Sequence, residues 1–198
     1  MRYSPEHKEE TKRRILLAAG RSFRKEGFSL AGIDGLARGA GVTSGAFYGH
    51  FSSKVEAFRA ALAAGMADLH HGIEECQARS ATGWVEALAD FYFTTRVTCD
   101  LAEGCALPSL SADVARGDAK TKAVFQKELL SVVAALAKGL PGENPEEREA
   151  RAFVMAALFA GGVTLARSVR DKAVRERIAS VLRSAVVACA SAPQLIKT

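Results

Sequence analysis

Residues 29–56 read SLAGIDGLARGAGVTSGAFYGHFSSKVE, and this stretch decides how the chain is built. Apolar residues at helical spacing precede a Gly-Ala-Gly turn at 39–41, where glycine tolerates backbone angles that other residues avoid. Thr43 follows the turn as the expected cap of a second short helix over 44–48. Two short helices joined by a turn of three or four residues that contains glycine form a helix-turn-helix.

The flanking segments extend this unit with longer helices. We expect a helix over 5–27, with Ser4 as its cap and a proline at its first position. Ser29 is expected to cap the short helix before the turn. A capping box at 53–56 predicts a long helix that runs to about residue 79.

The remainder also has helical spacing, and Ala and Leu exceed Ile plus Val, which favours helix over strand. With 198 residues, of which 48% are hydrophobic, the chain can bury a core without disulfides or metals. We therefore predict an all-α fold. The further helices are expected over 82–101, 104–116, 118–138, 144–169 and 171–193, with caps at Thr82, Asp118, Asn144 and Asp171.

The net charge of +5 is concentrated at one end of the chain. Residues 1–60 hold 11 Lys and Arg against 6 Asp and Glu, whereas residues 61–198 hold 16 of each. A basic N-terminal part on a neutral body indicates two different partners, and a polyanion suits the basic part. Basic side chains on a helix are nevertheless often only a solvated face.

Targeting and cysteine patterns predict a cytoplasmic protein. The start lacks an apolar run behind a basic end, and the uncharged stretch 152–166 is too short to span a bilayer, so we expect a buried helix and no membrane partner. The four cysteines include no CxxC pair, which is consistent with reduced thiols. We expect no metal site and no cofactor.

The stretch over 11–62 resembles the DNA-binding domain of the TetR/AcrR family of bacterial transcriptional regulators. The similarity rests on ILLAA…F…GF in the first helix, on IDGLARGAGVTSGAFYGHFSSK, and on the long helix that follows. This resemblance implies about nine helices, a helix-turn-helix DNA-binding domain at 1–52, and a helical effector-binding and dimerisation domain at 53–198.

The resemblance also implies a recognition helix over 44–48 that enters the major groove of double-stranded operator DNA. Small side chains at its start suit a groove about 12 Å wide. Thr43 is equally well explained as a cap alone, and Phe47 and Phe51 are expected in the core. The expected DNA contacts are Ser29, Thr43, Ser44, Gly45, Tyr48, His50 and Lys54.

Members of this family dimerise and bind a small molecule through the C-terminal helices, so we expect a homodimeric repressor that an effector releases from its operator. For each residue in the two sets that follow, the alternative is a place in the ordinary core of a single chain. The expected dimer interface comprises Phe153, Ala156, Phe159, Ala160, Val181, Leu182 and Ala185. The expected effector pocket comprises Trp84, Phe91, Phe93, Cys99, Cys105, Leu107, Phe125 and Phe159.

Modification of Cys105 is an alternative to small-molecule binding as the event that releases the DNA. The segment over 99–108 resembles a Gly-Cys segment in a subset of the family, some of whose members sense electrophiles or oxidants through that cysteine. A thiol near a helix start has a lowered pKa, but the acidic Asp100 and Glu103 would raise it. A buried, inert Cys105 is the opposing interpretation.

Two other classes of function fit less well. An enzyme would need clustered catalytic groups, and the chain has no GxSxG, phosphate loop or paired His-acid motif, so we predict that it is not an enzyme. A module whose basic helix binds RNA or an anionic membrane would not need the ordered helix-turn-helix.

Overall fold

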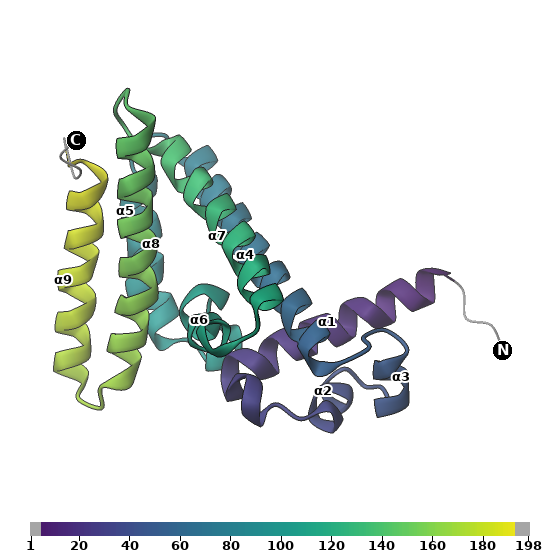
Figure 1. Ribbon diagram of the computed structural model, residues 1–198. Helices are drawn as coiled ribbons and strands as arrows, with labels where there is room; N and C mark the ends of the chain where they lie inside the picture. Colours follow the sequence, from purple (N-terminus) through teal and green to yellow (C-terminus); the bar gives the residue numbers. More distant parts are fainter. Residues whose placement is uncertain (1–4, 193–198) are drawn as a thin grey trace. The chain divides into compact units, whose positions relative to one another are not determined.

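The computed structural model describes residues 5–192, which are helical almost throughout and contain no strand (Figure 1). This confirms the predicted all-α class. The expected Ser4 cap lies outside the described residues. The elements are α1 (Pro5–Leu30), α2 (Ile33–Gly39), α3 (Ser44–Tyr48), α4 (Lys54–Arg79), α5 (Trp84–Asp90), the π-helix η1 (Phe91–Arg96), the 3₁₀ turn η2 (Leu101–Glu103), α6 (Ala106–Arg116), α7 (Ala119–Gly139), α8 (Pro145–Ser168) and α9 (Lys172–Ala190).

The described chain forms two compact units. The first holds the residues up to Gly65 together with Asp100–Phe125, and the second holds Met66–Cys99 together with the residues from Gln126 on. These units do not follow the predicted division at residue 52. The reason lies inside the first unit, where η2 and α6 pack against α1 although they are distant from it in sequence.

Aromatic rings form the centre of the first unit. Phe58 of α4 meets the rings of Phe23 and Phe28 edge-on, with centroids 5.2 and 5.1 Å away. The α4 backbone also approaches α6 closely, because a Cβ on Gly65 would lie 2.7 Å from the Ala106 Cβ. Side-chain hydrogen bonds reinforce this packing, since Arg24 donates to the Ala102 carbonyl at 2.7 Å.

The first helix ends as the sequence predicts, but the second begins later. Gly27 has φ of 76°, which breaks the helical path inside α1 at the predicted stop. Ser29, expected as the cap of the next helix, instead lies in the turn after this break. The N-cap of α2 is Gly32, which makes no side-chain capping bond. The Ser29 cap was therefore wrong, because Ser29 lies three residues before that N-cap.

The expected helix over 82–101 is interrupted. The N-cap of α5 is Gly83, so Thr82 is not the cap, and the helix widens into η1 at Phe91–Arg96 before ending at the short η2 turn. The other predicted caps are confirmed. Asp118, Asn144 and Asp171 each accept a hydrogen bond from a backbone N–H in the first turn of their helices.

The second unit is built on α8, which packs along α9 and against η1. Phe159 stacks on Tyr92 with ring centroids 4.2 Å apart, and the Phe93 ring lies 6.0 Å from the Phe159 ring. Among the described residues α8 is the one helix long and apolar enough to cross a membrane. Its Ala152, Met155 and Phe159 are nevertheless buried in this unit, which agrees with the expected core helix.

Candidate nucleic-acid interface

The turn between α2 and α3 is held from both sides. Gly41 adopts φ of 66°, and the N–H groups of Gly41 and Val42 bond back to the end of α2 at 3.0 Å. Arg14 of α1 donates from Nη2 to the Ala40 carbonyl at 2.5 Å. A Cβ on Gly41 would lie 2.7 Å from that nitrogen, so glycine is needed for space as well as for φ. The turn therefore fixes α3 on α1.

Two hydroxyl groups organise the start of α3. Thr43 is the N-cap, and its Oγ1 accepts a hydrogen bond from the Ala46 N–H at 3.1 Å, as predicted. Ser44 donates from Oγ to Asp34 Oδ1 at 2.5 Å, which ties α3 to the first turn of α2. The contacts of Arg14 and Asp34 could not be predicted, because both join residues that no local motif connects.

The opposite faces of α3 have different surroundings. Phe47 is fully buried, and Phe51 beyond the helix is almost so, which confirms both as core. Tyr48 is 55% exposed. Gly45 is exposed, has no positive φ, and a Cβ there would meet nothing closer than Thr43 Oγ1 at 3.9 Å. Nothing inside the described chain therefore requires a glycine at position 45.

Lys54 has an internal role that the sequence did not suggest. Its ammonium donates to the carbonyls of Phe28 at 2.8 Å and Ser29 at 3.5 Å, and lies 4.5 Å from the centroid of the Phe28 ring. These carbonyls lie in the turn that follows the break at Gly27, and the face of the Phe28 ring also attracts the cation. Lys54 therefore fastens the start of α4 to α1, and Ser29 contributes its backbone carbonyl.

His50 is half-buried between α3 and α4. Its Nδ1 is buried and has no hydrogen-bond partner among the described residues. Burial, followed by the nearby cations Lys8 and Lys12 of α1, lowers the pKa of His50 below its usual value. The neutral imidazole is thus the favoured form near neutral pH in the free protein.

The cations of α1 divide into two groups. Arg14 and Arg24 donate to backbone carbonyls of the first unit, and Arg21 pairs with Glu103. The contacts of Arg14 and Arg24 reinforce the packing of the first unit, whereas the exposed Arg21–Glu103 pair contributes little. A second group is exposed and lies on α1 and at the end of α2, and it comprises Lys8, Lys12, Arg13, Lys25 and Arg38. The charge surplus therefore serves both internal packing and an exposed basic surface.

The residues predicted for the effector pocket fall into both units. Cys105, Leu107 and Phe125 belong to the first unit, and the other five belong to the second. Their exposure also varies, from Phe159 and Trp84, which are buried, to Phe91, which is 40% exposed. Cys99 accepts a hydrogen bond on its sulfur from Arg167 Nη2 at 3.0 Å. Phe93 lines a cavity in the second unit, described below.

The residues predicted for the dimer interface lie on α8 and α9, at different depths. Phe153 and Val181 are exposed, whereas Ala160, Leu182 and Ala185 are half-buried. Ala156 and Phe159 are buried within the second unit itself. Any contact with a partner would therefore be made by the exposed and half-buried residues of this set, and Ala156 and Phe159 would lie beneath them.

Comparison with known proteins agrees with this geometry. The family model described as "Bacterial regulatory proteins, tetR family" matches residues 15–61, which cover the helix-turn-helix and parts of the helices on either side of it. Over this segment the chain is similar to the TetR family. Its resemblance to the TetR/AcrR regulators, inferred above from the sequence, is thereby confirmed.

Curated TetR-type relatives match over the same region. HTH-type transcriptional regulator SrpR of Pseudomonas putida is 51% identical over 55 residues, which cover 28% of this chain and 26% of SrpR. The uncharacterised HTH-type regulator TtgW, also of Pseudomonas putida, is 48% identical over 54 residues, which cover 27% of this chain and 40% of TtgW. The matched segments thus span well under half of each relative.

Solved structures match over most of the length. The reduced form of E. coli NemR has a TM-score of 0.74 and 21% identity, covering 88% of this chain and 96% of NemR. A TetR-family regulator of Streptomyces coelicolor has the same TM-score at 20% identity, covering 92% of this chain and 95% of its own. At these identities the likeness establishes a shared fold.

Proposed function

We propose that this chain is a DNA-binding transcriptional regulator, most simply a repressor, that binds an operator as a homodimer and leaves it when a small molecule binds. Residues 1–52 would supply the DNA contacts, and residues 53–198 the effector site and the dimer contacts. The observation that carries the proposal is the exposed face of α3, where Gly45 leaves open space beside the exposed Tyr48.

The DNA contacts follow from that face. Gly45 would let the α3 backbone come close to base edges, and the Thr43 and Ser44 oxygens retain lone pairs to accept hydrogen bonds. The Tyr48 hydroxyl would donate to a phosphate, and His50 would do so when it is protonated. We assign to Lys54 and Ser29 a supporting role, because their contacts position the end of α1 against α4.

Discrimination between DNA sequences would then depend on uncharged side chains. No Lys or Arg lies between Arg38 and Lys54. Base readout would therefore use small polar side chains, bridging water and groove shape, whereas the exposed cations of α1 and α2 would supply affinity that does not depend on sequence.

An exposed apolar stripe supports the homodimer. On α8 it comprises Val154, Ala157, Gly161 and Leu165, which recur at helical spacing and are all exposed. Val181 on α9 is 59% exposed. Two recognition helices must lie about one duplex turn apart to read two half-sites, and a two-fold dimer satisfies this spacing. Such a stripe buries itself against a second copy.

The proposal is tested by binding to DNA from the region upstream of the chain's own gene. We expect a fragment from that region to bind more tightly than a random duplex of equal length and base composition at moderate salt. Fluorescence anisotropy with both fragments measures the difference. Equal affinity for the two would refute the operator proposal.

A thiol switch at Cys105 is the second candidate. Cys105 is the N-cap residue of α6. The N-terminal end of a helix stabilises a thiolate, but the Cys105 side chain is buried. Under this alternative an alkylating agent releases DNA from the wild type and leaves the Cys105→Ser complex intact. Equal release from both proteins would refute the thiol switch.

We also propose that the protein is cytoplasmic, because its operator DNA and the electrophiles that react with a thiolate would both be encountered in the cytoplasm.

A further inference from the structure

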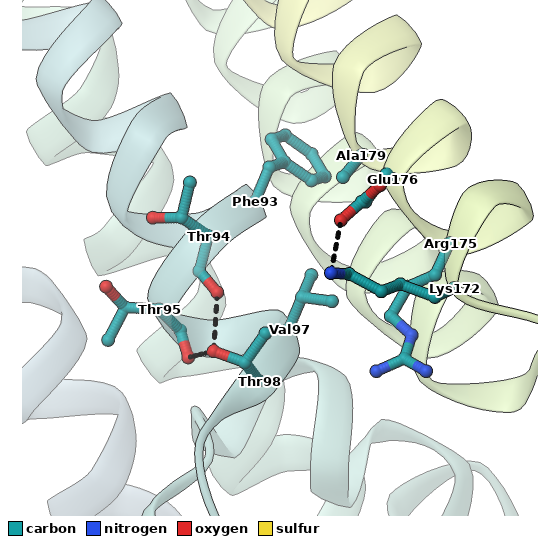
Figure 2. A pocket seen from close by; sticks show the side chains of 9 residues that line it. All are labelled: Phe93, Thr94, Thr95, Val97, Thr98, Lys172, Arg175, Glu176 and Ala179. Atoms are coloured by element: carbon teal, nitrogen blue, oxygen red, sulfur yellow. Dashed lines mark hydrogen bonds and ion pairs between the residues drawn. The ribbon is translucent and has the colours of Figure 1, made fainter.

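A cavity of about 550 Å³ lies between η1 and α9, entirely within the second unit (Figure 2). Its apolar floor consists of Phe93, Val97 and Ala179, all of which are buried. Polar and charged side chains form its rim, where the three threonines of one wall face the three charged residues of the other. These are Thr94, Thr95, Thr98, Lys172, Arg175 and Glu176.

Arg175 is the unusual member of the rim. Its Nε is buried and has no hydrogen-bond partner among the described residues. A buried donor on a charged group is costly to leave unpaired, so such groups nearly always have a partner. Lys172 adds a second positive charge, and its own partner Glu176 is 3.6 Å away in an exposed pair that contributes little.

The threonines show what kind of partner is missing. Thr94 donates its hydroxyl proton to the Asp90 carbonyl at 2.6 Å, and Thr98 donates to the Thr94 carbonyl at 2.9 Å. The donors of these two threonines are therefore used inside the helix. The charged donors on the rim, on Arg175 and Lys172, are both cationic, and a carboxylate or a related anion satisfies such donors.

The cavity is built on a fixed wall. A π-helix is rare, and such segments occur frequently at functional sites. Here the π-helical η1 supplies Phe93, Thr94 and Thr95. Phe93 is held from behind, because the α8 backbone approaches so closely that a Cβ on Gly162 would lie 2.7 Å from its ring. The apolar floor therefore does not need to form around a ligand.

The cavity and the proposed dimer surface use different sides of α9. Each residue advances about 100° around a helix, so Val181 lies roughly 120° away from Arg175 on the helix wheel. Ala179 lies on the same side as Arg175 and is buried, whereas Val181 is exposed. Pairing of two copies through the exposed stripe would leave the cavity open.

We propose that this cavity binds an amphipathic organic anion, with its acidic head on Arg175 and Lys172 and its apolar body against Phe93, Val97 and Ala179. The ligand class follows from a cationic rim with an unpaired donor above an apolar floor. The site does not depend on the proposed operator binding, since occupancy can be measured on the protein alone.

The test compares four small probes by isothermal titration calorimetry on the full chain. Decanoate carries the head and the body, 1-decanol and decyltrimethylammonium keep the body with a neutral or positive head, and acetate keeps the head alone. We expect decanoate to bind saturably and at least about tenfold more tightly than each of the others, as one charged hydrogen bond allows. Absence of saturable decanoate binding, or equal binding of 1-decanol, overturns the proposal.

Matched variants locate the site. Arg175→Gln should reduce decanoate affinity roughly tenfold, to the level of 1-decanol, whereas Arg177→Gln on the far side of the same helix should leave it unchanged. Ala179→Leu fills the floor and should remove binding of both decanoate and 1-decanol, with circular dichroism checking that the fold is kept. Unchanged decanoate affinity in Arg175→Gln places the ligand elsewhere and refutes the site.

Discussion

Tyr48 presents a largely exposed phenol on α3, where its hydroxyl can reach a ligand from solvent. We expect Tyr48→Phe to weaken binding to all duplexes by about tenfold, because one hydrogen bond to a charged phosphate is lost. The slope of affinity against salt should not change, since no charge is removed. Anisotropy titrations at several salt concentrations measure both. Loss of affinity confined to the upstream fragment would instead indicate a base contact.

His50 makes the free protein sensitive to acid. Its pKa is lowered in the folded state, so the unfolded chain takes up the proton first as pH falls. Stability is therefore complete above the usual histidine pKa and decreases as pH drops through and below it. We expect the melting temperature to fall between about pH 7.5 and about pH 5.5, and His50→Gln to reduce that fall. Identical pH profiles for the two proteins would contradict the role assigned to the buried Nδ1.

Single residues were predictable where a local motif acts and unpredictable where distant segments meet. The Thr43 cap and the buried Phe47 follow from spacing along one helix, and both predictions are confirmed. Lys54 was expected to contact DNA. Its ammonium instead contacts the carbonyl of Phe28, 26 residues earlier, and only the packing of α1 against α4 determines that contact.

Among the elements, α8 carries two adjacent glycines with opposite surroundings. A Cβ on Gly162 would lie 2.7 Å from the Phe93 ring and 2.8 Å from Leu182, whereas a Cβ on Gly161 meets nothing within 4 Å. We expect Gly162→Ala to lower the free energy of unfolding by about 1–3 kcal/mol through overpacking.

Gly161→Ala is the matched control for that substitution. It should raise the free energy of unfolding by about 0.5–1 kcal/mol, because alanine restricts the unfolded chain and adds no clash within the chain. Because Gly161 lies in the proposed dimer stripe, both variants are compared in the Val181→Glu background, in which we expect the protein to be monomeric. Urea unfolding of the two variants measures the difference. If both change stability in the same direction, the close approach of α8 to Phe93 and Leu182 is wrong.

Helix boundaries could be predicted wherever a side chain caps the first turn. Asp118, Asn144 and Asp171 carry their signal in the sequence because an oxygen at the N-cap meets a local N–H. The π-helical widening at Phe91–Arg96 has no comparable local signal. It forms where Phe93 must fit between α8 and α9, which depends on tertiary packing.

For the whole molecule, the exposed stripe on α8 and α9 should determine the oligomeric state. We expect Val181→Glu to convert a dimer into a monomer, because it places a charge in an apolar contact, and to abolish tight operator binding with it. Leu130→Glu changes an equally aliphatic exposed residue on α7, outside the stripe, and should have neither effect. Analytical ultracentrifugation distinguishes the two variants, and a wild-type monomer at all concentrations would contradict the proposed dimer.

Fold class, helix order and the similarity to TetR-family regulators could all be predicted from the sequence, because periodicity, caps and the helix-turn-helix are local patterns. The division into two units could not, since it depends on η2 and α6 returning to α1. The cavity at Arg175 was also missed. Phe93 was expected in a pocket, but its opposite wall comes from α9, about eighty residues later in the chain.

Entry of α3 into a DNA groove is the claim on which the proposed function depends, and Gly45→Ala tests it. The added methyl has open space in the protein, so the free energy of unfolding should stay unchanged or rise by up to about 1 kcal/mol. Affinity for the upstream fragment should fall at least about tenfold, because the methyl fills space that the groove would occupy. Gly72→Ala, an equally open helical glycine on α4, should leave affinity unchanged. If Gly45→Ala binds the upstream fragment as tightly as the wild type does, α3 does not make the contact proposed for it.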